Sequence, residues 1–153
     1  MTPVLNLATQ APYFYSNYDF TGFATHAERQ FATQDDGLYE LVGDTDADIP
    51  ISAHITTALL DFGEPHLKTL TAAYAGYRAA DSLTLTVSVP QDSGTLTADY
   101  ALDVTSPVAV MQRFKLGKGV RSRYWQFQIT GSADFELETL DILPVVLQRR
   151  VSP

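Results

Sequence analysis

Ser82-Leu83-Thr84-Leu85-Thr86-Val87-Ser88-Val89 alternates between polar and apolar side chains without a break. Successive side chains of an extended chain point to opposite faces, so the apolar residues share one face and the Ser and Thr residues share the other. Pro90 ends the run because it cannot donate to a strand ladder, and residues 91–94 have the composition of a turn. Residues 95–102 then resume the alternation, which predicts a β-hairpin over residues 82–102.

Strand patterns recur on the N-terminal side of this hairpin. Residues 37–42 and 51–60 flank a turn-rich segment, which predicts a second hairpin. Residues 65–78 have apolar spacing that fits either a helix or a strand, and their threonines and aromatics favour a strand. Residues 24–31 predict a short helix, the one helical segment expected in the chain.

The C-terminal side is also strand-like. Residues 124–129 place Trp125 on one face together with Phe127 and Ile129, so the single tryptophan is expected in the core. Residues 135–138 continue as a strand, and the alternation slips by one residue after Glu138, which indicates a bulge or a strand end.

Short strands separated by turns, with little helix between them, are typical of an antiparallel β-sandwich, jelly-roll-like or immunoglobulin-like. We expect this all-β domain to cover residues 23–153. Residues 1–22 are rich in aromatics but lack clean alternation, so they are interpreted as an N-terminal arm. Its aromatic residues, Tyr13, Tyr15 and Phe20 among them, either pack on a neighbouring molecule or cover one end of the chain's own core.

Composition excludes several classes of function. The 153 residues contain no cysteine, which removes disulfides, thiolate metal sites and cysteine nucleophiles. The net charge of -8 argues against nucleic acid as the main partner, because affinity for phosphate backbones is built from clustered Lys and Arg. No stretch is apolar over the roughly 18 residues that a membrane span needs, so none is expected.

The charges are unevenly distributed. Residues 1–66 contain one basic residue and ten acids, whereas the remainder has nine basic residues and eight acids. Five basic residues lie close together with no acid among them: Arg113, Lys115, Lys118, Arg121 and Arg123. Opposite potentials orient association, so the acidic half and this basic stretch either complement each other between copies or are simply solvated. These five residues are candidate interface residues.

The chain lacks a recognisable catalytic or cofactor motif. Its three histidines lie far apart, no phosphate-binding loop or nucleophile elbow is present, and no catalytic residue, cofactor or metal is expected. Asp44, Asp46 and Asp48 occupy alternate positions, as the first ligands of a calcium-binding loop do. The glycine and the glutamate that an EF-hand loop requires at later positions are missing. A solvated acidic turn is favoured, with a different kind of calcium site as the alternative. Asp134, Glu136 and Glu138 are interpreted as acids on the polar face of a strand.

A series of motifs resembles tail proteins of tailed bacteriophages and prophages. The matching segments run from about residue 35 to the C-terminus: Gly37-Leu38-Tyr39-Glu40-Leu41 with its acidic turn, Leu59-Leu60-Asp61-Phe62-Gly63 followed by Lys68, Leu83-Thr84-Leu85-Thr86-Val87, Leu116-Gly117-Lys118-Gly119-Val120-Arg121-Ser122-Arg123-Tyr124-Trp125-Gln126-Phe127, and Ala133-Asp134-Phe135-Glu136-Leu137 leading into Pro144-Val145-Val146-Leu147. The block around Arg121 is the most specific, and the Asp-Phe-Gly segment is similar to one in β-domains of tail nozzles and hubs.

This resemblance implies a non-enzymatic structural protein of the virion, made in the host cytoplasm and located in the tail. It would form part of the tail tip, the baseplate or an adaptor ring, as a homo-oligomer around the tail axis in contact with other tail proteins. The aromatic content indicates an alternative function. The chain would then be a carbohydrate-binding, receptor-binding β-sandwich module that stacks exposed rings on sugars.

The orientation of two arginines stays open. Arg121 and Arg123 share a face with Trp125 if the chain is regularly extended, and they then lie over aromatic surface or at a contact between subunits. If the parity changes near Tyr124, Trp125 turns to the core and the arginines turn away from it.

Overall fold

The computed structural model describes residues 2–147, apart from residues 9, 11, 17, 44, 47, 92 and 118 and the side chain of Asp46. The chain divides into two compact units, Met1–Gly43 and Asp44–Pro153, which are described separately below. The sequence places a boundary after residue 22, whereas the contacts group residues 23–43 with the N-terminal segment. Every regular element in the described residues is a strand, which confirms the all-β prediction.

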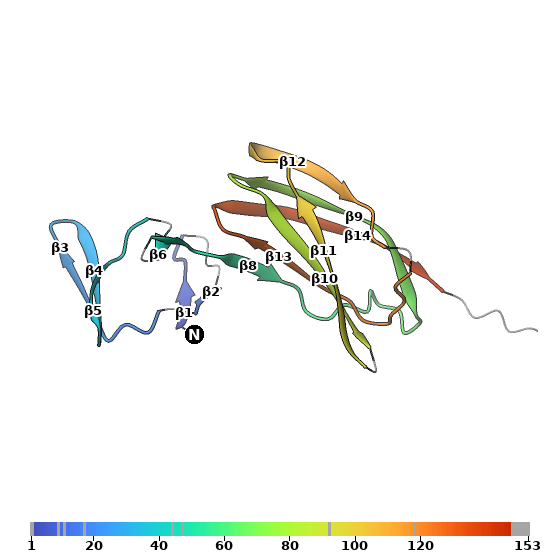
Figure 1. The fold of residues 1–153 in the computed structure, drawn as a ribbon, viewed down its shortest axis with the longest axis horizontal. Coiled ribbons are helices and arrows are strands. Elements are labelled where there is room, and N and C mark those ends of the chain that lie inside the picture. The colour runs from blue at the N-terminus through green and yellow to red at the C-terminus, as the bar shows by residue number, and fades with distance from the viewer. Residues whose placement is uncertain are drawn as a thin grey trace, which may run out of the picture. The chain divides into compact units, whose positions relative to one another are not determined.

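The second unit is an antiparallel β-sandwich (Figure 1). One layer has the strand order β11-β10-β13-β8, and the other has the order β12-β9-β14. The strands are β8 (Ala53–Thr56), β9 (Lys68–Ala79), β10 (Leu83–Gln91), β11 (Gly94–Leu102), β12 (Ser106–Phe114), β13 (Gln126–Gly131) and β14 (Phe135–Val146), preceded by the short pair β6 (Thr45–Asp46) and β7 (Ile49–Pro50).

The hairpin over residues 82–102 is confirmed as β10 and β11, which pair from Leu83↔Leu102 to Gln91↔Gly94. All four apolar residues of the SLTLTVSV run are buried, and they pack against the β9 side of the core. Burying each such side chain contributes about 1.5–3 kcal/mol. The alternation of β10 therefore supplies one wall of the sandwich core.

The strand predicted from residues 65–78 is β9, the central strand of its layer, with β12 on one side and β14 on the other. Small residues such as Ala73 and Ala75 are fully buried along it. The slip expected after Glu138 is confirmed by a register shift between Leu137 and Thr139. Trp125 is also in the core as predicted, with 3% of its surface exposed.

The hairpin predicted between residues 37–42 and 51–60 is wrong. Residues 37–40 form β5, which pairs with β4, and residues 53–56 form β8, which pairs with β13. Ile55 lies opposite Ile129 in that second pairing. A partner far along the chain thus replaces the nearest neighbour.

The first unit contains two small antiparallel sheets. β1 (Thr2–Leu5) pairs with β2 (Pro12–Tyr15), and β3 (Gly22–His26), β4 (Arg29–Gln34) and β5 (Gly37–Glu40) form a three-stranded meander. The expected arm of residues 1–22 thus contains a hairpin of its own.

The helix predicted over residues 24–31 is wrong, because these residues form the turn of the β3–β4 hairpin. Ala27 and Glu28 at its tip have φ values of 48° and 65°, which a right-handed helix does not permit. Two successive positive φ angles suit a two-residue hairpin turn, whose twist matches that of the flanking strands. The predicted helical segment is instead divided between the two paired strands and their turn.

The burial of Tyr77 can be tested through the pH dependence of stability. Its ring is fully buried, and its hydroxyl donates to Gln112 Oε1 at 2.7 Å. Burial raises the pKa of Tyr77 above its ordinary value of 10.0, the charge of Asp103 adds to this, and a main-chain hydrogen bond with Val104 opposes it. A raised folded-state pKa means that the stability contributed by protonated Tyr77 is complete below pH 10 and is lost as pH rises through the folded value.

We therefore expect the free energy of unfolding to fall between pH 9 and pH 11 more steeply in the wild type than in Tyr77→Phe. Urea unfolding at several pH values measures both slopes. The other tyrosines are common to both proteins, so the difference isolates Tyr77. Parallel slopes would show that Tyr77 ionises in the folded state as easily as in the unfolded state.

Candidate functional site

The candidate interface residues of the second unit lie on the basic segment, defined here as residues 113–123. Arg113 is at the end of β12, and Lys115, Arg121 and Arg123 follow in the connection to β13. All four side chains are exposed. Lys118, the fifth predicted residue, lies outside the described residues.

Aromatic rings position two of these arginines. The Arg113 guanidinium lies 5.7 Å from the centre of the Tyr74 ring, and that of Arg123 lies 5.1 Å from the centre of the Tyr124 ring. Among the described residues, no carboxylate forms an ion pair with Arg113, Lys115, Arg121 or Arg123. The basic segment therefore presents ordered cations with their charge unneutralised.

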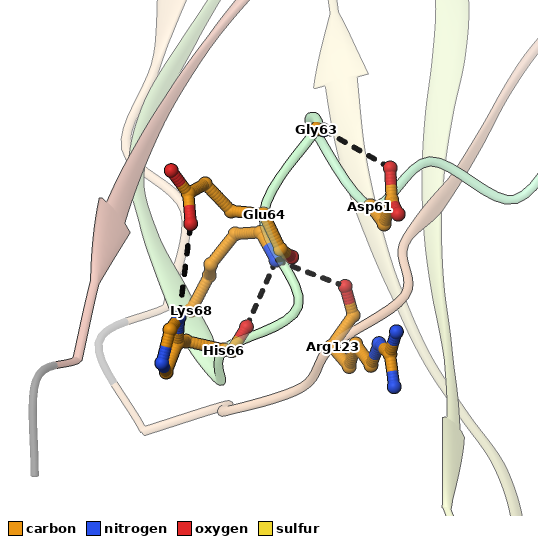
Figure 2. Close-up of polar contacts among 6 residues, drawn as sticks. All are labelled: Asp61, Gly63, Glu64, His66, Lys68 and Arg123. Atoms are coloured by element: carbon orange, nitrogen blue, oxygen red, sulfur yellow. Dashed lines mark hydrogen bonds and ion pairs between the residues drawn. The ribbon is translucent and has the colours of Figure 1, made fainter.

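A buried lysine holds the basic segment in place (Figure 2). Lys68 is completely buried, and its Nζ donates to the carbonyl oxygens of Glu64 at 2.5 Å, His66 at 2.9 Å and Arg123 at 3.3 Å. Three acceptors use all three donors of an ammonium group, which is how a buried charge becomes tolerable. Two segments 55 residues apart are joined by this one side chain.

Main-chain pairing reinforces the same connection. Lys68 N donates to Ser122 O at 2.8 Å and Ser122 N donates to Lys68 O at 3.0 Å. Three residues later, Trp125 exchanges the same kind of pair with Leu60. Ser122 and Trp125 are buried while Arg123 and Tyr124 between them are exposed, so the parity changes at this point. Of the two orientations considered, the structure has the arginines turned away from the core.

The loop before Lys68 is the Asp-Phe-Gly segment of the sequence. Gly63 N donates to Asp61 Oδ1 at 3.0 Å, and Phe62 and Gly63 have φ values of 54° and 72°. The side chain of Asp61 thus stabilises a tight left-handed turn (Figure 2). His66 Nδ1 lies 3.7 Å from Glu64 Oε2, and both side chains are exposed. The loop presents the two carbonyls that Lys68 binds.

Sequence patterns did not single out Lys68 as a buried residue. One signal was present: Lys68 has the same parity in β9 as the buried Leu70, so a regular strand turns both inward. Lysine is almost never fully buried, and this prior outweighs the parity. What a sequence lacks is the position of the carbonyls of residues 64, 66 and 123.

The aromatic candidates lie in the first unit. Tyr13 and Tyr15 are on β2 and are each 47% exposed, and Phe20 is half-buried. The ring of Phe20 lies 4.9 Å from that of Tyr18, 5.6 Å from that of Tyr39 and 6.1 Å from that of Phe23. Phe20 is therefore part of a small aromatic cluster within its own unit, and Tyr15 joins the cluster through Tyr18, with their ring centres 5.3 Å apart. Tyr13 and the exposed part of Tyr15 are available to another surface.

The first unit has almost no core. Ala32 is its only buried residue among those described. Large apolar side chains remain exposed instead: Leu5, Leu7, Tyr13, Phe14, Tyr15, Phe23, Leu38 and Val42. Phe14 and Phe23 are 65% and 62% exposed. Such a high density of exposed apolar side chains marks an interaction surface.

An ion pair closes the meander of the first unit. The guanidinium of Arg29 donates two hydrogen bonds to the carboxylate of Glu40. This hydrogen bonding lowers the pKa of Glu40, with the positive charge of Arg29 adding to it, and raises the pKa of Arg29. Glu40 is thereby occupied, whereas Asp19, Glu28 and Asp35 form no ion pair with a described residue.

The carboxylates of β14 are occupied by an arginine. Arg78 contacts Glu136 at 3.1 Å and Glu138 at 2.8 Å. An open depression of about 550 Å³ lies beside them, lined by Arg78, Phe135, Asp134 and the turn after Thr105. Of the acids that line it, Glu136 is a partner of Arg78, and among these described lining residues no nucleophile is paired with a base.

Metal binding gains no support from the geometry of the described residues. Nowhere in that part of the chain do three His, Asp or Glu side chains gather as ligands. Asp44 and the side chain of Asp46 lie outside the described residues, and Asp48 has a φ of 67°. The calcium hypothesis for this turn therefore stays untested. The described part of the chain also has no helix of the length and apolarity that crossing a bilayer requires.

The outer face of the β11-β10-β13-β8 layer is polar. Its register places Thr84, Thr86 and Ser88 of β10 beside Thr97 and Asp99 of β11, and beside Gln126, Gln128 and Thr130 of β13. No aromatic side chain stands among them to stack on a sugar. Exposed rings concentrate in the first unit instead.

No protein-family model matches the chain, and neither the curated proteins nor the solved structures provided a match. The surfaces described above are therefore the basis for a functional proposal.

Proposed function

We propose that this chain is a non-enzymatic structural protein that functions within an assembly, as a component of the tail of a tailed bacteriophage. The observation that carries the proposal is the first unit, whose large apolar side chains are exposed and whose described residues include one buried residue, Ala32. A protein that works alone in water has no use for such a surface, whereas a subunit covers it on assembly.

The energetics of small sheets support this role. An isolated two-stranded hairpin is marginally stable at best, and chains of about 40 residues rarely bury enough surface to fold alone. The 43 residues of the first unit contain no cysteine to staple them. The apolar surface of this unit must therefore be covered by another surface for the unit to be stable.

The tail location rests on the motif resemblance. The block from Leu116 to Phe127 includes most of the basic segment and its junction with β13, where Lys68 binds the main chain of Ser122 and Arg123. A basic surface whose described cations have no carboxylate partner in the described residues suits contact with other tail proteins or with another copy in a ring. We propose both kinds of partner, other tail proteins and further copies of this chain.

Purified particles test the proposal directly. We expect this chain to copurify with intact tailed particles through a density gradient, to be detected by peptide mass spectrometry at several copies per particle, and to be labelled by antibody on the tail. Host proteins of similar abundance in the lysate serve as the control. Absence of the chain from the particles, with other tail proteins detected, would contradict a virion role.

Carbohydrate binding is the second candidate. β2 carries three consecutive exposed rings, Tyr13, Phe14 and Tyr15, of the kind that stack on sugars. A glycan array probed with the wild type and with Tyr13→Ala/Tyr15→Ala tests it, and binding that disappears in the variant would favour this candidate. Tyr124→Ala, which removes an exposed ring of the second unit, is the matched control.

A further inference from the structure

We propose that the first unit of one copy docks on the basic segment of a second copy, in a head-to-tail contact between identical chains. This inference rests on the proposed assembly role and specifies its partner and its two surfaces. The proposed partner is a second copy of this chain, whose basic segment carries the charge opposite to that of the first unit.

Charge complementarity identifies the two surfaces. The first unit contains one arginine and five carboxylates, and the arginine is already paired with Glu40. The basic segment contains five cations and no acid, and its four described cations lack a carboxylate partner in the described part of the chain. Each surface therefore carries the charge that the other needs for neutralisation.

Apolar burial supplies the attraction. Phe14, Phe23 and Leu7 of the first unit are 62–86% exposed. Near the basic segment, Tyr124 and Leu67 are exposed by 38% and 54%. Arginines stacked on tyrosines and surrounded by apolar groups are typical of the centre of protein interfaces.

A contact between the first unit of one copy and the basic segment of the next joins two different surfaces of identical chains. Contacts of this kind generate rings or filaments.

Charge reversal in the full chain tests the contact. Arg121→Glu/Arg123→Glu reverses the basic segment, and Glu28→Lys/Asp35→Lys reverses the first unit. All four side chains are exposed, and Lys68 binds the main chain of Arg123, so neither variant removes a described support of the fold. Circular dichroism and thermal unfolding verify that both variants remain folded.

Sedimentation equilibrium measures self-association of the wild type, of each variant alone and of the two variants mixed. We expect a concentration-dependent oligomer for the wild type and at least roughly tenfold weaker association for each variant alone, because like charges now face each other. The mixture should return to within about threefold of the wild type, since each reversed surface meets its complement. Raising the salt concentration should weaken the wild-type oligomer.

The control variant is Asp81→Lys/Asp134→Lys, which changes the net charge as much as Glu28→Lys/Asp35→Lys but lies in the second unit. It should associate as the wild type does. A monomeric wild type, reversal variants that associate normally, or variants that mixing does not restore would each overturn the inference. A chain that is found in particles but remains monomeric overturns this contact alone, whereas self-association without incorporation into particles contradicts the tail role alone.

Discussion

Replacing Lys68 by methionine is expected to lower the free energy of unfolding by about 2–4 kcal/mol. Methionine retains the length of the side chain but removes the ammonium group. The carbonyl oxygens of Glu64, His66 and Arg123 then lose their shared donor. Each buried acceptor left without a partner costs about 1–3 kcal/mol, reduced wherever water reaches it. Urea unfolding at neutral pH measures the loss.

Lys115→Met is the matched control, because it removes the same group from an exposed position. Surface substitutions of this kind change stability by about 0.5 kcal/mol or less. Equal stability of the two variants would show that the amino group of Lys68 contributes nothing to the fold. Hydrogen exchange should also identify the location of the effect, with the amides of Ser122 and Trp125 losing protection before those of β10.

Replacing Trp125 by alanine is expected to cost about 3–5 kcal/mol, the usual range for deleting a large buried aromatic ring. Trp125 is 3% exposed and belongs to the cluster that joins the two layers. Its Nε1 also donates to Ser122 O at 3.3 Å, close to the main-chain pair between Ser122 and Lys68. Thermal unfolding should therefore shift downward by well over ten degrees in a domain of this size.

Two further variants test whether the loss in Trp125→Ala comes from the buried ring. Tyr124→Ala removes a neighbouring ring that is 38% exposed, so it should cost far less. Trp125→Phe retains most of the apolar volume and should fall between Trp125→Ala and the wild type. A loss for Tyr124→Ala as large as that for Trp125→Ala would contradict the assignment of Trp125 to the core.

The sequence predicts best where a pattern is local. The alternation of residues 82–89 sets the buried face of β10, and residues 91–94 set its turn, so the first hairpin follows from neighbouring residues alone. The bulge after Glu138 is visible for the same reason, because a slip of one residue disturbs the period of two. The inward position of Trp125 follows from the face that it shares with Phe127 and Ile129.

The errors arise where the partner is distant. β5 and β8 are close in sequence and both extended, yet β8 lies beside β13 more than 70 residues later, and no local pattern encodes that choice. The residues around Glu28 form two strands and a tight turn, where the sequence predicted a single helical segment. Only part of the candidate site could be predicted from the sequence. The run of basic residues indicated the basic segment, but the role of Lys68 depends on three carbonyl groups that folding brings together.

The position of β9 has a consequence for synthesis on the ribosome. The strand holds the centre of its layer, yet both of its partners follow it in the chain, with β14 ending only at Val146. One edge of β9 in an emerging chain is therefore unpaired until β12 ends at Phe114, 35 residues after Ala79, and the other edge until β14 ends at Val146, 67 residues after Ala79. At about 5–20 residues per second the longer interval lasts several seconds. During that time the open edge of an alanine-rich strand can pair with another chain.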